Sequence, residues 1–218
     1  MAGRAIPPDG AGPRRRLPRA ARVVAPAMLM VVIIAAGLGW IGGRLMAPSG
    51  DGEDTVVFGD SVTHLASEEI AAAAGAEVVA FDGVRWADMV PAVELTLQLL
   101  PRTPRRVGVL IGSNDVLTLA IDEAQVDGVL DQLSDVDCVV VMELPKTFGG
   151  FHRQMNRRLR DAVAERPNMV TDDRWRVAAD RNLEDEDGSL FEEDKIHPKP
   201  AGQQLLAEAY QGALDEHC

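Results

Sequence analysis

The sequence predicts a three-layer α/β/α domain in which helices cover both faces of a sheet of about five parallel strands. Three observations predict it. Short apolar runs alternate with longer segments of helical periodicity from residue 55 onwards. The runs are apolar at successive positions, which is typical of parallel strands buried on both faces. Glycine-rich or polar turns follow the runs, as at the ligand-binding edge of such a sheet.

Strand and helix signals alternate in order along the domain. The first apolar run stops at Gly59, and the first two helical segments are closed by Gly75 and Pro101, which end helices. A loop rich in acidic residues is expected between the last strand and the last helix. The expected strands are 56–58, 77–81, 106–111, 138–143 and 168–171, and the expected helices are 64–74, 87–100, 123–133, 152–165 and 200–214.

The N-terminal region predicts a membrane anchor. Residues 1–22, rich in Pro, Gly, Ala and Arg, are expected to form a disordered basic tail. Residues 23–41 lack charged side chains and are about long enough to cross a bilayer as one helix. The preceding arginines place the N-terminus in the cytoplasm by the positive-inside rule, so the domain at 54–218, after a linker at 42–53, is expected to be extracytoplasmic.

Two alternatives to the anchor are a cleaved signal peptide and a soluble cytoplasmic protein. The apolar run is long for a signal peptide, and no good small-x-small cleavage site follows it. The arginines that flank the run argue against a cytoplasmic protein. An uncleaved signal anchor is therefore favoured.

Charge and cysteine content limit the partners. Residues 1–47 carry a net charge of +6 and the whole chain −12, which leaves −18 on residues 48–218. So acidic a domain is a poor candidate for binding nucleic acid. Its two cysteines make neither a disulfide framework nor a metal site. Cys138 lies in an apolar run and is expected in the core. A bridge between Cys138 and Cys218 stays open, although the sequence alone gives no support for one.

Ser61 lies where the first strand meets the following helix. A serine at such a junction projects from the edge of the sheet, and the helix N-terminus supplies free N–H groups and partial positive charge. This position suits a nucleophile whose reaction develops an oxyanion. A serine here is also the usual helix N-cap, and Gly-Asp-Ser alone favours that interpretation.

Asp194 and His197 form a second candidate pair. At a spacing of three residues their side chains can face the same way. The carboxylate can then accept from one ring nitrogen and leave the other free to take a proton from a serine. The alternative is a surface pair within an acidic loop. Gly83 and Asn114 follow two further strands, so they are expected at the same edge of the sheet as Ser61.

These segments resemble the four sequence blocks of the SGNH (GDSL-like) hydrolases in order and approximate spacing. The resemblance covers nearly all of residues 54–218 and none of residues 1–53. It implies a flavodoxin-like sandwich around five parallel strands. The matching segments are Gly59-Asp60-Ser61, Gly83, Gly112-Ser113-Asn114-Asp115 and Asp194-Lys195-Ile196-His197-Pro198.

The resemblance also implies a role for each site residue. Ser61 would be the nucleophile, His197 the general base and then acid, and Asp194 the residue that orients His197. The oxyanion hole would comprise the N–H groups of Ser61 and Gly83 and the side-chain amide of Asn114. Neither a metal nor a cofactor is implied.

The function expected is that of a serine esterase acting on a small ester, such as an O-acetylated glycan or sugar. Two alternatives stay open: a cell-envelope O-acyltransferase, and a catalytically idle SGNH-fold module that binds a glycan or a partner. Asp60 and Asp115 are expected to serve turns and helix caps, and His64 is expected on a helix surface.

Overall fold

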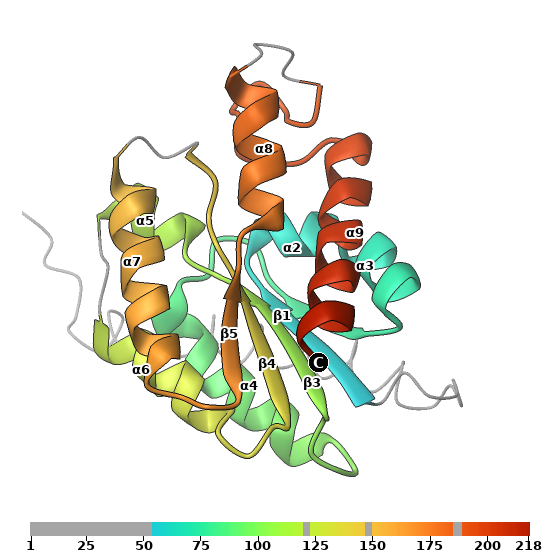
Figure 1. Ribbon diagram of the computed structural model, residues 1–218, viewed down its shortest axis with the longest axis vertical. Helices are drawn as coiled ribbons and strands as arrows, with labels where there is room; N and C mark the ends of the chain where they lie inside the picture. Colours follow the sequence, from blue (N-terminus) through green and yellow to red (C-terminus); the bar gives the residue numbers. More distant parts are fainter. Residues whose placement is uncertain (1–53, 120–122, 147–149, 185–188) are drawn as a thin grey trace, which may run out of the picture. The chain divides into compact units, whose positions relative to one another are not determined.

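The computed structural model describes residues 54–119, 123–146, 150–184 and 189–218, and at their centre lies a sheet of five parallel strands. The strand order is β2-β1-β3-β4-β5 (Figure 1). The order reverses between β1 and β3, which in an open α/β sheet places the ligand site beyond their carboxyl ends. The predicted α/β class is confirmed. The strands are β1 (Thr55–Gly59), β2 (Glu77–Ala80), β3 (Arg106–Leu110), β4 (Cys138–Met142) and β5 (Met169–Asp172).

The strands form because valine-rich runs fit a sheet that is covered on both sides. β1, β3 and β4 are buried along almost their whole length, and β3 pairs with β4 from Arg106–Cys138 to Val109–Val141. Glycine is needed at one position in this core. A Cβ on Gly108 would lie 2.9 Å from Cε1 of Tyr210, so the bare backbone lets a helix pack directly on β3.

Helices cover both faces of the sheet. In Figure 1, α4, α6 and α7 lie on one face, and α3 and α9 lie on the other, with α8 beside α9. The two groups bury the apolar side chains of the strands between them. The helices are α2 (Ser61–Leu65), α3 (Ser67–Ala74), α4 (Trp86–Leu99), α5 (Ser113–Thr118), α6 (Glu123–Gln132), α7 (Phe151–Ala164), α8 (Arg174–Glu184) and α9 (Pro200–His217).

The structure corrects the prediction at three helices. The segment expected to be an acidic loop contains α8, which buries Trp175 and Ala179 one turn apart. At its start the Arg174 N–H donates to the side chain of Asp172, the last residue of β5, at 2.9 Å. Because only two residues of α8 are fully buried, its helical periodicity is weak, and the acidic residues that follow it suggested a loop. The helix expected at 64–74 begins at Ser61 and is divided at Ala66. The short helix α5 was not predicted.

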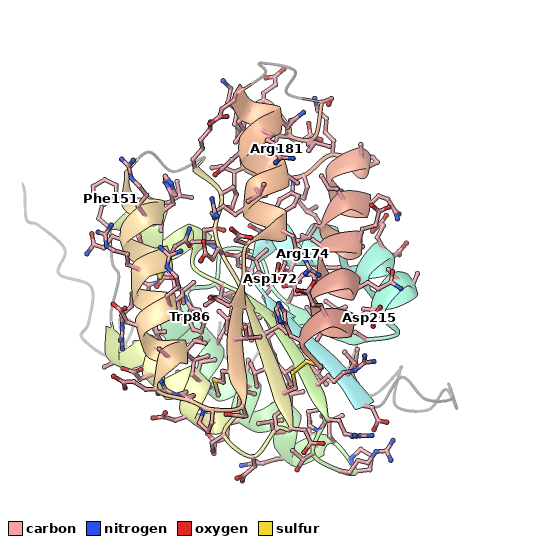
Figure 2. The ribbon with its side chains drawn as sticks, in the orientation of Figure 1. Trp86, Phe151, Asp172, Arg174, Arg181 and Asp215 are labelled. Carbon is pink, nitrogen blue, oxygen red and sulfur yellow. A yellow bond between two sulfur atoms is a disulfide. The ribbon has the colours of Figure 1, made fainter. Side chains whose placement is uncertain are left out.

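The cysteines also need a correction. Cys138 is half-buried at the start of β4, not a core residue, and it is bonded to Cys218 with the two Cα atoms 5.7 Å apart (Figure 2). The bond ties the end of α9 to the edge of the sheet opposite the predicted site. The two residues are 80 positions apart, so only the fold brings them together.

The predicted basic tail (1–22), membrane helix (23–41) and linker (42–53) lie outside the described residues. Within the described part of the chain, no helix combines the length and the apolar character that a bilayer span requires.

Candidate active site

The segment around Ser61 is held by a tight turn. Asp60 caps α2 by accepting from the Val62 N–H at 3.1 Å, which leaves Ser61 as the first helical residue, 8 % exposed. A second oxygen of Asp60 accepts from the Ser113 N–H at 3.0 Å, so the turns after β1 and β3 are tied together. Gly59 is required because a Cβ there would collide with the side chain of Thr63. The predicted capping role of Asp60 is confirmed.

Asp194, His197 and Ser61 form a continuous chain of hydrogen bonds. Oδ2 of Asp194 lies 2.6 Å from Nδ1 of His197, and Nε2 of His197 lies 3.1 Å from Oγ of Ser61. A carboxylate at Nδ1 favours the tautomer with its proton there, so Nε2 is left to accept from the serine hydroxyl. The arrangement can therefore move a proton from Ser61 to His197. The structure brings together the three residues that were predicted from distant parts of the chain.

A closed loop presents the Asp194–His197 pair. The Glu192 N–H donates to the His197 carbonyl at 2.8 Å, and Phe191 pairs with Pro198 in an antiparallel bridge. Lys195 adopts φ 60°, a left-handed conformation that is uncommon for a side chain other than glycine. The turn that this conformation makes directs Asp194 back towards His197.

Asp194 is kept ionised by the loop that carries it. Partial burial acts to raise the pKa of Asp194, but hydrogen bonds outweigh it and hold the pKa below its usual value. Oδ1 accepts from the N–H groups of Ile196 at 2.9 Å and His197 at 3.0 Å, and Oδ2 faces the imidazole. A fixed anion at this position can stabilise a positive charge on His197.

The three predicted oxyanion donors lie on the turns after β1, β2 and β3. Among the described residues, no acceptor is found for the N–H groups of Ser61 and Gly83. Gly83 has φ +73°, which turns its backbone as few other residues can. Asn114 donates one amide hydrogen to the Val84 carbonyl at 2.9 Å, and its second hydrogen has no protein acceptor among them. This bond fixes Asn114 against the turn that carries Gly83.

Two buried carboxylates support these turns. Burial raises the pKa of Asp60, although hydrogen bonds from Ser113 and from the Val62 N–H act to lower it. Burial also raises the pKa of Asp115 to about 6. Asp115 accepts from the Trp86 N–H at 3.2 Å, so it joins α5 to the start of α4 rather than capping its own helix.

A histidine beside the site lies on its surface. His64 is exposed on α2, as predicted, and its Nδ1 lies 2.8 Å from Oδ1 of Asp82 in the turn before Gly83. The described residues contain no group of three or more His, Cys, Asp or Glu side chains that could hold a metal ion.

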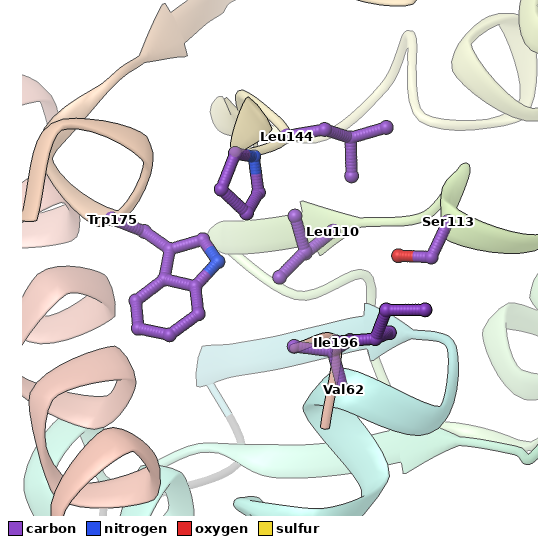
Figure 3. A pocket seen from close by; sticks show the side chains of 7 residues that line it. Val62, Leu110, Ser113, Leu144, Trp175 and Ile196 are labelled. Carbon is purple, nitrogen blue, oxygen red and sulfur yellow. The ribbon is translucent and has the colours of Figure 1, made fainter. Parts of the chain in front are cut away.

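A small cavity adjoins the site, and the sequence did not predict it (Figure 3). It is small, with room for roughly one water molecule where the walls enclose it, and its walls are mainly apolar. Three lining residues are the chain neighbours of Ser61, Asn114 and His197, while the others come from β3, the turn after β4, and α8. The lining residues are Val62, Leu110, Ser113, Leu144, Pro145, Trp175 and Ile196.

Comparison with known proteins gives a likeness in structure but not in sequence. No family model matches the chain, and no curated protein shows a significant match. A structure of the C-terminal catalytic domain of peptidoglycan O-acetyltransferase A from Streptococcus pneumoniae is similar, with a TM-score of 0.58 at 20 % identity over 74 % of this chain and 92 % of that one.

Two further solved structures are similar over most of their length. An acetyl xylan esterase from Geobacillus stearothermophilus gives a TM-score of 0.60 at 19 % identity, covering 78 % of this chain and 97 % of that one. A GDSL-like lipase from Bacteroides thetaiotaomicron gives 0.58 at 14 % identity, covering 81 % and 95 %. The described part of the chain therefore has the fold of the SGNH (GDSL-like) hydrolases.

Proposed function

We propose that this domain is a serine hydrolase that cleaves a small ester through an acyl-serine intermediate. The observation that carries the proposal is the hydrogen-bonded chain from Asp194 through His197 to Ser61. In the first step Oγ of Ser61 bonds to the ester carbonyl carbon while Nε2 of His197 takes the hydroxyl proton. The bond to the leaving alcohol then breaks, and the alcohol departs with the proton from His197.

The second step repeats the same chemistry with water. His197 takes a proton from a water molecule as the water oxygen bonds to the acyl carbon, and then returns that proton to Oγ of Ser61 as the bond between Oγ and the acyl carbon breaks. In both steps the negative oxygen would be held by the N–H groups of Ser61 and Gly83 and the amide of Asn114. Each such donor is typically worth about 3 kcal/mol of the barrier. Asp194 would stabilise the imidazolium that forms in each step.

The proposed substrate carries a short acyl group on a sugar or a glycan. The small size of the mainly apolar cavity beside the catalytic residues supports a short acyl group. The similar structures include an acetyl xylan esterase and the catalytic domain of a peptidoglycan O-acetyltransferase. Both names refer to acetyl groups on polysaccharides, and this supports a glycan ester for the present chain.

The test is a steady-state assay of a short-chain chromogenic ester with the full-length chain and its variants. Removal of a triad member is expected to lower kcat/KM by several orders of magnitude. Ser61→Ala and His197→Ala should both do so while the circular dichroism spectrum stays unchanged. A folded wild-type protein that is no faster than either variant would contradict the proposal, and would favour a catalytically idle binding module.

A second candidate is acyl transfer to a glycan acceptor. The likeness to the O-acetyltransferase domain favours it, and the same acyl-serine would serve both reactions. The partition is measurable: the acyl-enzyme is formed from a chromogenic donor, and free acid and acylated oligosaccharide are both quantified. Predominant acylation of the oligosaccharide in 55 M water would identify a transferase, and release of free acid alone would identify a hydrolase.

The proposal includes a membrane anchor at residues 23–41 and an extracytoplasmic catalytic domain. The apolar run flanked by arginines supports the anchor. The Cys138–Cys218 bond supports the location, because structural disulfides persist mainly in oxidising compartments. Membrane fractionation combined with protease treatment of intact cells tests both parts. Recovery of the protein in the soluble cytoplasmic fraction would contradict them.

A further inference from the structure

Trp175 has a feature that the proposed mechanism does not use. Its side chain is fully buried, and its indole N–H has no hydrogen-bond acceptor among the described residues. Figure 3 shows the nitrogen-bearing edge of the ring turned towards Leu110 and the space between the lining residues. A buried donor without an acceptor is unfavourable, so a donor directed into a cavity indicates a ligand atom that accepts from it.

The indole is held firmly in this orientation. Its ring packs against Phe191, with ring centroids 5.8 Å apart and planes inclined at 52°. The next residue, Arg176, donates to the buried carboxylate of Glu143 at 2.8 Å, and this bond pins α8 to the end of β4. Because ring and helix are both anchored, the N–H cannot easily turn away to find another acceptor.

The cavity lies beside the catalytic residues, because three of its lining residues are their neighbours along the chain. Val62 directly follows the nucleophile, and Ile196 directly precedes His197. Ser113 precedes Asn114 on the third side. The reacting carbonyl lies between these three catalytic groups in the proposed mechanism. The acyl chain would therefore enter a space whose walls are apolar except for Ser113 and the Trp175 N–H.

We propose that this cavity selects a short acyl group that carries an oxygen acceptor, of which hydroxyacetyl is the smallest, and that the Trp175 N–H donates to that oxygen. The inference rests on the proposed esterase function. A plain hydrocarbon chain would displace water from the cavity and leave the N–H unpaired. A site built to hydrogen-bond one atom of a substrate discriminates against the analogue that lacks it.

The test compares hydroxyacetyl and propionyl esters of the same alcohol, which differ by a hydroxyl in place of a methyl group. The ratio of their kcat/KM values is measured by pH-stat titration for the wild type and for Trp175→Phe. Phenylalanine keeps an aromatic ring and removes the N–H. The difference in intrinsic reactivity of the two esters cancels when the ratios are compared between proteins. The kcat/KM for the hydroxyacetyl ester divided by that for the propionyl ester should be about three- to tenfold higher in the wild type than in Trp175→Phe.

Trp86→Phe is the matched control. Trp86 is also fully buried with an unpaired N–H, but it does not line the cavity, and its Nε1 lies against Gly112. Its ratio should equal that of the wild type. Equal ratios in the wild type and in Trp175→Phe would overturn the proposal, because a water molecule would then satisfy the N–H whatever the acyl group.

A second variant keeps the proposal testable if Trp175→Phe does not fold. Leu144→Val shortens another wall of the cavity, and should raise the activity towards butyryl esters relative to acetyl esters. An unchanged chain-length profile would overturn the assignment of the cavity to the acyl group. Absence of any ester hydrolysis by the folded wild type would overturn the proposed function and this inference together, whereas equal ratios in an active enzyme would overturn the inference alone.

Discussion

Reducing the Cys138–Cys218 bond should lower the stability of the domain strongly without removing its activity. The bond closes a loop of 80 residues, and the chain-entropy relation gives about 4.5 kcal/mol for a loop of that size. The end of α9 stays attached after reduction, because His217 contacts Asp172 at 3.1 Å and Arg174 contacts Glu216 at 2.6 Å. The loss should therefore arise mainly from the greater freedom of the unfolded chain.

The expected shift is large enough to measure directly. For a domain of this size each kcal/mol changes Tm by about 2–4 °C, so Tm should fall by about 10–15 °C on reduction. The assay is thermal unfolding of the full-length chain with and without reductant, and the double variant Cys138→Ser/Cys218→Ser serves as the control that reductant should not affect. Ester hydrolysis at 25 °C should persist, since Cys138 begins β4 and the site lies beyond its other end. Two free thiols in the untreated protein, or an unchanged Tm, would refute the reasoning.

Three further predictions concern the site and its supporting turns. Asp194→Asn should lower kcat by roughly 10³–10⁴-fold with unchanged circular dichroism, because the new NH₂ group faces Nδ1 of His197 and favours the wrong tautomer; kcat within tenfold of the wild type would contradict this. Asp115→Asn tests the pKa of about 6. The native state binds the carboxyl proton of Asp115 more tightly than the unfolded chain does, so the wild type should lose stability relative to the variant as the pH rises from about 4 to about 7. A difference in urea midpoints between the two proteins that does not change with pH would count against it. Gly59→Ala should cost about 1–3 kcal/mol in urea unfolding, because its Cβ would collide with buried Thr63. Gly128→Ala in α6, whose Cβ would meet only Val90 Cγ2 at 3.5 Å, should be neutral or stabilising, and equal losses in the two variants would refute the steric argument.

The sheet could be predicted from the sequence because local signals specify it. Strands buried on both faces appear as continuous apolar runs, and all five strands were expected at nearly their observed positions from these runs. Helix α8 was missed because a two-residue anchor, Trp175 and Ala179, gives little periodicity. The disulfide could not be decided from the sequence because its partners are brought together only by the docking of α9.

The candidate site likewise has a part that could be predicted from the sequence and a part that could not. Ser61, Asp194 and His197 were predicted because each lies in a motif at a turn, and motif residues can be found in a sequence without knowing the fold. The cavity could not be found in this way. Leu144, Trp175 and Ile196 are ordinary apolar residues in three separate segments, and nothing in their local sequence distinguishes a cavity wall from the core. Specificity therefore has to be inferred from the structure.

The most direct test of the central claim is to locate the covalent adduct of a fluorophosphonate probe by peptide mass spectrometry. The hydrogen-bonded chain predicts one adduct per molecule, on Ser61, formed much more slowly in His197→Ala and absent in Ser61→Ala. An adduct on another residue, or no adduct on a folded wild-type protein, would contradict the account.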